Sequence, residues 1–226
     1  MAKAPAHVWI LVGLGLLAVG SSPILIRLAG DVPALTLAAW RTMAVTAVFA
    51  PVALAQSRAE VAAFSLREWA LVLGAGVLLG LHFMAWIVSV QLTSVASASV
   101  LVTTSPVFIA VLGAVFLSER PSRRTAAAIG VAVVGAVMIG LSEGSGSGVY
   151  PNPALGNSLA LGAAVLVSVY LLIGRSVRQR TSFVAYFALL NGAAAVTCLV
   201  GVWVAGVPLG LPWPIALLAI AMGIGP

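Results

Sequence analysis

One stretch of the sequence decides the fold: SVASASVLVTTSPVFIAVLGAVFLSERPSRRTAAAIGVAVVGAVMIG, residues 94–140. Its apolar run over residues 96–117 is long enough to cross a bilayer, where polar groups need partners within the protein. Four residues near the middle of this run are nevertheless polar or helix-breaking: Thr103, Thr104, Ser105 and Pro106. Pro106 has no N–H for the carbonyl of Val102, so the helix should bend there and leave an acceptor free. Because bent helices with free polar groups commonly line cavities, this stretch predicts a solute pathway.

The composition of the chain is that of a membrane protein. Its 226 residues are 62% hydrophobic and 7% charged, and its mean hydropathy is +1.18, which is outside the range of soluble domains. Basic residues exceed acidic ones by 11 to 5. In a soluble protein this excess would suggest nucleic acid, but here the charges lie in short loops between apolar runs. We therefore expect a lipid bilayer as partner, and no nucleic acid. The single cysteine, Cys198, excludes an internal disulfide.

Seven apolar stretches have the length of a membrane span. They are residues 8–29, 33–55, 70–91, 96–117, 125–141, 155–174 and 183–205. An eighth begins near Trp213 and reaches Pro226 after 14 residues, whereas a span needs about 20. We therefore expect an all-α, multi-span integral membrane protein of about seven and a half helices, as a fragment or a truncated product.

The basic residues indicate the orientation in the membrane. Nine of them fall on one side: Lys3, Arg58, Arg67, Arg120, Arg123, Arg124, Arg175, Arg178 and Arg180. The opposite loops hold only Arg27. The positive-inside rule therefore predicts a multi-pass protein of the inner or plasma membrane with a cytoplasmic N-terminus. Residues 3–20 also resemble a secretory signal peptide, but the apolar continuation over residues 24–28 favours a retained helix.

A polar connection, SEGSGSGVYPNP, divides the chain at residues 142–153. Residues 1–141 contain five expected spans. A second copy of a five-span unit would enter the membrane from the opposite side, as in the inverted repeats of many secondary transporters. We therefore expect a first repeat over residues 1–141, an extracytoplasmic linker over residues 142–153 and an incomplete second repeat over residues 154–226. Modest similarity between residues 21–27 and 168–175 supports this division.

Several motifs together carry a family resemblance. The fourth helix contains SPVF at residues 105–108, it ends in LSER at residues 117–120, and a glycine-rich helix follows over residues 130–140. Supporting motifs are GSS at residues 20–22, WR at residues 40–41 and SVASAS at residues 94–99. In these respects the chain resembles EamA-type members of the drug/metabolite transporter superfamily. The resemblance implies ten helices in two inverted five-helix repeats, a central cavity, and export of amino acids or other small metabolites.

Polar groups at a common depth are candidates for substrate binding. At 1.5 Å per residue, Ser21, His82 and Thr103 lie roughly 18–20 Å from the cytoplasmic face. His82 and Trp86 are four residues apart on one helix face, where they could contact a zwitterionic or aromatic solute. Tyr170 is a polar group at membrane depth in the second half. We expect these five residues to bind substrate. Alternatively, His82 bonds a carbonyl, Trp86 faces lipid or packs between helices, and Ser21 only kinks its helix.

Five further residues are expected to have structural or gating roles: Pro23, Arg41, Pro106, Glu119 and Arg120. Arg41 lies inside the second helix, where a charge facing lipid would cost several kcal/mol. It either contacts a substrate carboxylate, pairs with Asp31 or bonds to helix ends. Glu119 and Arg120 are expected to form a cytoplasmic turn that caps the fourth helix and binds the fifth.

The sequence also lacks several chemical signatures. It has no Asp or Glu in the apolar cores, no phosphate-binding P-loop and no cluster with metal-ligand spacing. We therefore expect no cofactor, no metal and no enzymatic activity, but a secondary transporter that moves a small-molecule solute by alternating access. The alternatives are an intramembrane enzyme that uses His82, or a truncated protein that does not transport. Gly76 and Gly80 favour packing within the protein, and a homo-oligomer is left open.

Overall fold

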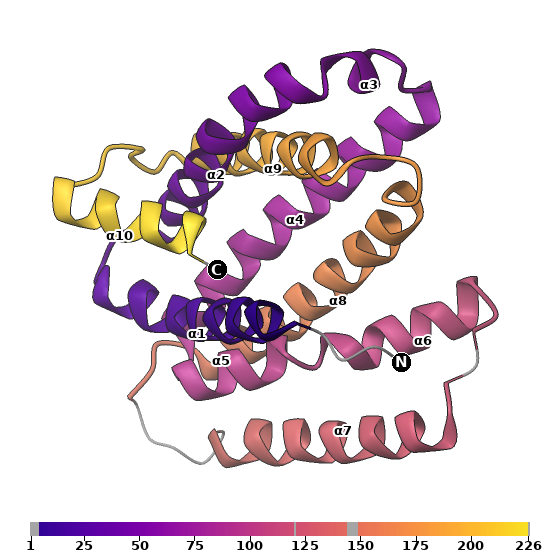
Figure 1. Ribbon diagram of the computed structural model, residues 1–226. Helices are drawn as coiled ribbons and strands as arrows, with labels where there is room; N and C mark the ends of the chain where they lie inside the picture. The colour runs from indigo at the N-terminus through magenta and orange to yellow at the C-terminus, as the bar shows by residue number, and fades with distance from the viewer. Residues whose placement is uncertain (1–4, 120, 144–148, 226) are drawn as a thin grey trace.

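The computed structural model describes residues 5–119, 121–143 and 149–225, and these residues form helices joined by short loops (Figure 1). The helices are α1 Ala6–Leu28, α2 Ala34–Gln56, α3 Arg58–Ala62, α4 Leu66–Leu92, α5 Val95–Val102, α6 Ser105–Phe116, α7 Arg123–Glu143, α8 Pro153–Val177, α9 Phe183–Ala205 and α10 Trp213–Ile224. Six helical stretches in the described residues are long and apolar enough to cross a membrane, with α5 and α6 counted as one. A further helix, α7, occupies the fifth expected span. The predicted all-α membrane class is confirmed.

The fourth expected span is broken in the middle. α5 ends at Val102 and α6 begins at Ser105, so the expected bend is a two-residue interruption. The hydroxyls of Thr103 and Thr104 donate to backbone carbonyls three residues earlier, at 2.8 and 2.6 Å. Pro106 lies in the first turn of α6, where a backbone N–H would have no helical partner in any case. The interruption therefore places the proline where no helical N–H bond is lost.

α4 occupies the centre of the bundle and packs against α8 and α9 (Figure 1). Its contact with α9 depends on glycine, because a Cβ built at Gly80 would lie only 2.8 Å from Cβ of Thr197 and 2.9 Å from the carbonyl oxygen of Ala194. Gly76 meets α9 one turn away. The prediction that this glycine pair packs within the protein is confirmed.

The start of α4 differs from the expected boundary. The helix begins at Leu66, whereas the apolar run predicted a start at residue 70. Ser65 and Glu68 form a capping box, in which the Ser65 hydroxyl accepts from the Glu68 N–H and the Glu68 carboxylate accepts from the Ser65 N–H. These bonds extend the helix past the apolar run. The short helix α3 was also not expected from hydropathy.

The loops gather at two opposite ends of the bundle. At one end the Arg27 guanidinium donates to the carbonyl of Thr93, and the Gln91 amide donates to the carbonyl of Val32 at 2.8 Å. At the other end the Glu60 carboxylate accepts from the N–H of Ser182 at 2.6 Å. Connections that the predicted spans assign to one side therefore meet in space. This places successive helices in alternating directions.

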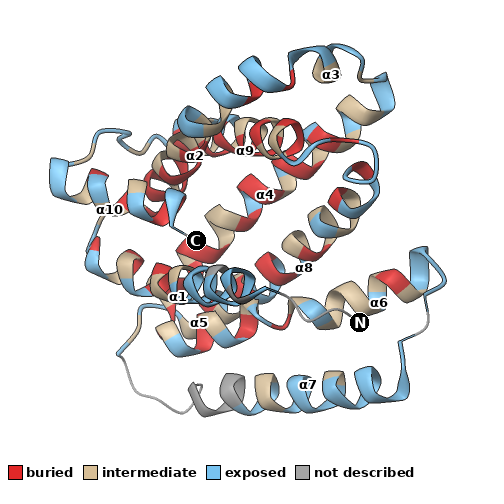
Figure 2. Ribbon diagram, in the orientation of Figure 1, coloured by how far each residue is buried: buried red, intermediate tan, exposed pale blue. Residues whose placement is uncertain are grey.

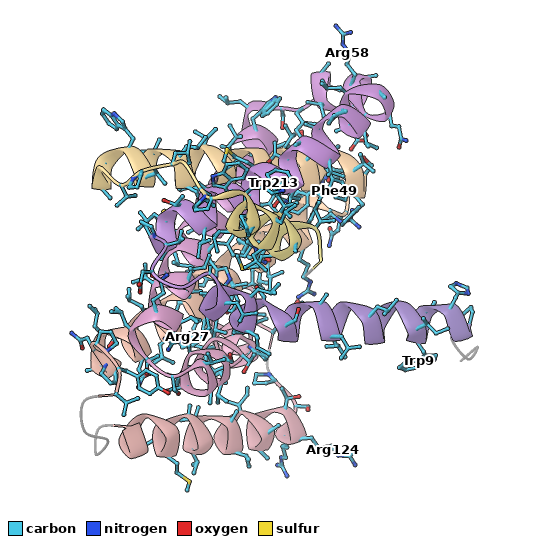
Figure 3. The ribbon with its side chains drawn as sticks, turned by 90° about the vertical axis from the view of Figure 1, so that its left-hand side faces the viewer. Trp9, Arg27, Phe49, Arg58, Arg124 and Trp213 are labelled. Atoms are coloured by element: carbon cyan, nitrogen blue, oxygen red, sulfur yellow. The ribbon has the colours of Figure 1, made fainter. Side chains whose placement is uncertain are left out.

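Exposed apolar side chains cover the outer helices. The first half of α1 and most of α7 are exposed, whereas buried residues gather on α4 and α9 (Figure 2). α1 extends away from the other helices toward Trp9, which is 65% exposed (Figure 3). A protein with so much exposed apolar surface on long helices has a hydrocarbon environment as its natural solvent.

Candidate functional site

A cavity of about 340 Å³ lies at the centre of the bundle. Its walls come from α1, α2, α4, α8, α9 and α10 together with the interruption between α5 and α6, and its polar lining includes Ser22, Arg41, His82, Trp86, Thr103 and Tyr170. By helical rise, Ser22, Arg41 and Tyr170 lie about 9–11 Å from the nearer end of their helices. Ser22 and Arg41 are counted from one end of the bundle and Tyr170 from the other, so the cavity lies between the two ends, within the membrane-spanning region.

A larger hollow is a weaker candidate for a binding site. It has a volume of about 440 Å³ and lies mainly between α2 and α9, where Thr46 and Arg58 are its only polar lining residues. A solute site needs several converging polar groups to orient the solute. The central cavity has them and this hollow does not.

Arg41 is the charged residue of the central cavity. Its side chain comes from the second turn of α2 and is only 7% exposed. Nη1 donates to Oγ of Ser22 at 3.2 Å, and Cζ lies 4.1 Å from the ring centroid of Phe83 and 5.8 Å from that of Trp86. Among the described residues Arg41 forms no ion pair, so the expected alternative of pairing with Asp31 is not found.

His82 and Trp86 lie on the same face of α4 and both line the cavity. Their rings are nearly parallel, at 6° and with centroids 6.5 Å apart. Nδ1 of His82 lies 2.8 Å from the carbonyl oxygen of Ala163, which can only accept, so Nδ1 carries a hydrogen and Nε2 is an acceptor in the neutral ring. Nε1 of Trp86 is buried and has no hydrogen-bond partner in the described part of the chain. The pair thus gives the cavity one acceptor, Nε2 of His82, and the ring of Trp86, whose own N–H is buried.

Of the other three expected substrate-binding residues, two line the cavity and one does not. Thr103 and Tyr170 line the cavity, with the Thr103 hydroxyl donating to the carbonyl of Val100. Ser21 does not line it. The next residue, Ser22, lines the cavity instead, and the Ser21 hydroxyl donates to the carbonyl of Ala18 at 2.8 Å. Adjacent helical residues point about 100° apart. The sequence therefore could not decide which of the two serines faces inward.

Asn191 is a lining residue that the expected set did not include. It is 4% exposed, and its Nδ2 donates to the carbonyl of Phe187 at 2.9 Å. This bond leaves the side-chain oxygen as an acceptor. Its position could have indicated this role, because an amide side chain within an apolar helix needs a polar partner when it is buried.

The expected gating residues take different positions. The Glu119 carboxylate accepts two hydrogen bonds from Arg175 of α8, both 2.8 Å long, instead of binding the helix that follows. Arg175 thereby holds the pKa of Glu119 below its ordinary value. Pro23 lies inside α1, which continues through it, and Pro106 starts α6. Arg120 lies outside the described residues.

Comparisons with known proteins bear on this arrangement. Residues 7–141, more than half of the chain, match the model of the EamA-like transporter family. None of the curated proteins compared with the chain matches it. A solved structure titled "Crystal structure of protein" is similar with a TM-score of 0.65 and 21% sequence identity, over 98% of this chain and 75% of that chain. At this identity the likeness concerns the fold alone.

Proposed function

The chain belongs to the EamA-like transporter family of multi-pass membrane proteins, and from that premise we propose that it exports a small organic solute, such as an amino acid, by alternating access. The observation that carries the proposal is the polar cavity at mid-membrane depth. Substrate sites of secondary transporters lie near the bilayer midplane where two repeats meet. This cavity fits that position, since its walls come from both residues 1–141 and residues 154–226.

In this proposal four residues of the expected set contact the substrate: His82, Trp86, Thr103 and Tyr170. All four line the cavity, and they come from α4, the interruption after α5, and α8. Ser22 replaces Ser21 in the proposed site, because Ser22 lines the cavity and Ser21 does not. Hydroxyls, an imidazole and aromatic faces suit a small molecule that has both polar and apolar parts.

Alternating access needs a contact that opens at one end. We assign this role to the ion pair between Glu119 and Arg175, which joins the end of α6 to the end of α8. Both side chains are about half exposed, at 50% and 58%, so the pair is weak enough to break during a transport cycle. The interruption at Thr103 and Thr104 lets α6 move relative to α5.

The proposed orientation puts the N-terminus and the arginine-rich loops in the cytoplasm. Two observations support it. Arg67, at the start of α4, and Arg180, in the loop after α8, line one hollow, and Arg175 lies in the last turn of α8, just before that loop. The positive charges thus gather at one end, as expected of a cytoplasmic face.

The function can be tested by efflux from cells that express the protein. Cells are loaded with radiolabelled amino acids, and initial efflux rates are compared at equal membrane abundance. We expect His82→Ala and Thr103→Ala to slow efflux, whereas His7→Ala and Thr125→Ala, at exposed positions, serve as matched controls that keep the wild-type rate.

Three outcomes would contradict parts of this proposal. Wild-type efflux in both cavity variants would remove the site assignment. A covalently altered product of the solute would favour an intramembrane enzyme that uses His82. If no solute in a broad metabolite panel left expressing cells faster than control cells, the chain would not be a transporter.

A further inference from the structure

The central cavity carries a positive charge that has no acidic partner among the described residues. A guanidinium stays protonated in proteins, so Arg41 brings a permanent cation into this buried space. Of the five acidic residues in the sequence, four have side chains that the structure describes, and these lie elsewhere, at Asp31, Glu60, Glu68 and Glu119. None of these lines the cavity, and Arg41 has no ion pair within the described ranges. A buried charge is normally paired, because burial without a partner is costly.

The protein contacts of Arg41 leave most of its binding capacity unused. Of its five N–H groups, one donates to Ser22 within the described residues. The faces of Phe83 and Trp86 attract the cation, but aromatic rings offset only part of a buried charge. These rings also restrict the position of the guanidinium, since one lies 4.1 Å and the other 5.8 Å from Cζ.

A second donor belongs to one of the rings beside this cation. Trp86 is 7% exposed, and its Nε1–H is buried without a partner in the residues described. It comes from α4, so it is independent of the α2 residue Arg41. Both side chains line the same cavity, and both can only donate hydrogen bonds. A buried N–H group without a partner, on a ring beside a fixed cation, is suited to an anionic oxygen.

We propose that Arg41 and Trp86 form a carboxylate subsite in the cavity, an inference that rests on the transport function proposed above. The guanidinium binds the carboxylate of the solute, the Trp86 indole N–H donates to one of its oxygens, and Phe83 borders the apolar part of the solute. A monoanion balances the single positive charge. A phosphate dianion would leave one negative charge uncompensated, so a carboxylate is the better match.

Two kinds of solute carry this group: simple organic acids and amino acids. An amino acid would add an ammonium, for which Nε2 of His82 and the side-chain oxygen of Asn191 are acceptors in the same cavity. The experiment therefore compares 3-phenylpropionate with phenylalanine, which have the same apolar part and differ in the ammonium.

The subsite is tested by equilibrium binding to the purified chain in lipid nanodiscs. The probes are tritiated 3-phenylpropionate and tritiated phenylalanine, with 3-phenylpropionamide as the uncharged competitor. We expect the acids to bind at least about tenfold more tightly than the amide, because hydrogen bonds to charged groups are the stronger ones. If phenylalanine binds more tightly than 3-phenylpropionate, the preferred solute is an amino acid.

Variants test which residues cause the preference for the acids over the amide. Arg41→Gln and Trp86→Phe should each reduce the preference for acid over amide about tenfold. Trp86→Phe keeps an aromatic ring and removes only the N–H, so it tests the subsite even if Arg41→Gln does not give a monodisperse protein. Arg58→Gln and Trp203→Phe change an exposed arginine and an exposed tryptophan, and should leave binding unchanged.

The inference would be overturned if the amide bound as tightly as the acids, if neither acid bound, or if both cavity variants kept the wild-type preference. Efflux that depends on His82 and Thr103 but not on Arg41 would remove the subsite and leave the transport proposal intact. Binding that depends on Arg41, without efflux of any solute, would keep the subsite and remove the transport proposal.

Discussion

The contact between α4 and α9 allows a sharp prediction from one methyl group. In Gly80→Ala, the new Cβ would lie 2.8 Å from Cβ of Thr197 and 2.9 Å from the backbone oxygen of Ala194. Carbon atoms in contact are normally about 3.5–4.0 Å apart. The backbone oxygen cannot move without its helix, so α9 must shift. Overpacking of this kind costs about 1–3 kcal/mol, and we expect the free energy of unfolding to fall by that amount.

Gly74→Ala is the matched control on the same helix. A Cβ at Gly74 has no atom within 4 Å, so this change adds a better helix former without a clash. We expect Gly74→Ala to keep or raise stability, by at most about 1 kcal/mol.

The assay is unfolding of the purified protein by sodium dodecyl sulfate in mixed micelles, followed by circular dichroism. Gly80→Ala should unfold at a lower mole fraction of detergent than wild type, and Gly74→Ala should not. Equal midpoints for the two variants would refute the close backbone approach of α4 to α9. Since both helices line the cavity, the described position of two of its walls would then also be wrong.

Three further outcomes test other parts of the structure. Because Arg175 lowers the pKa of Glu119 below 4.5, the ion pair stabilises the fold above that pH and its contribution is lost as pH falls through the lower folded-state pKa. The stability difference between wild type and Glu119→Gln should therefore shrink at acid pH and in high salt, and a difference unchanged by either would contradict the pair. Cys198, which is 0% exposed, should react with a maleimide only after unfolding, and rapid labelling of the native protein would argue against its burial. In a Cys198→Ala background, a membrane-impermeant maleimide added to intact cells should label Val149→Cys and not Gln179→Cys, whereas the reverse pattern would invert the proposed orientation.

Much of the fold could be predicted because its signals are local. Runs of apolar residues located the long helices, and the proline at residue 106 located the interruption of the fourth span. The ends of helices were less predictable, because hydropathy ignores capping. α4 begins four residues earlier than its apolar run does, and the bonds between Ser65 and Glu68 that cause this were present in the sequence as a capping-box pattern.

The partners of charged residues could not be predicted in the same way. Glu119 binds Arg175, which is 56 positions away along the chain, and no local pattern relates the two. Arg41 was expected to meet a solute, to pair with Asp31 or to bond to helix ends. The described residues show it bound to Ser22 and against two aromatic rings. Such partners depend on how separate helices pack.

The sequence alone determined that this is a helical membrane protein and where its long helices lie along the chain, because hydropathy is a property of successive residues. Only the tertiary structure decided which face of each helix meets the cavity. That face depends on the rotation of each helix about its axis, which side-chain packing between helices sets. A rotation of about 100° separates Ser21 from Ser22, and the same packing brings Arg41 of α2 next to Trp86 of α4.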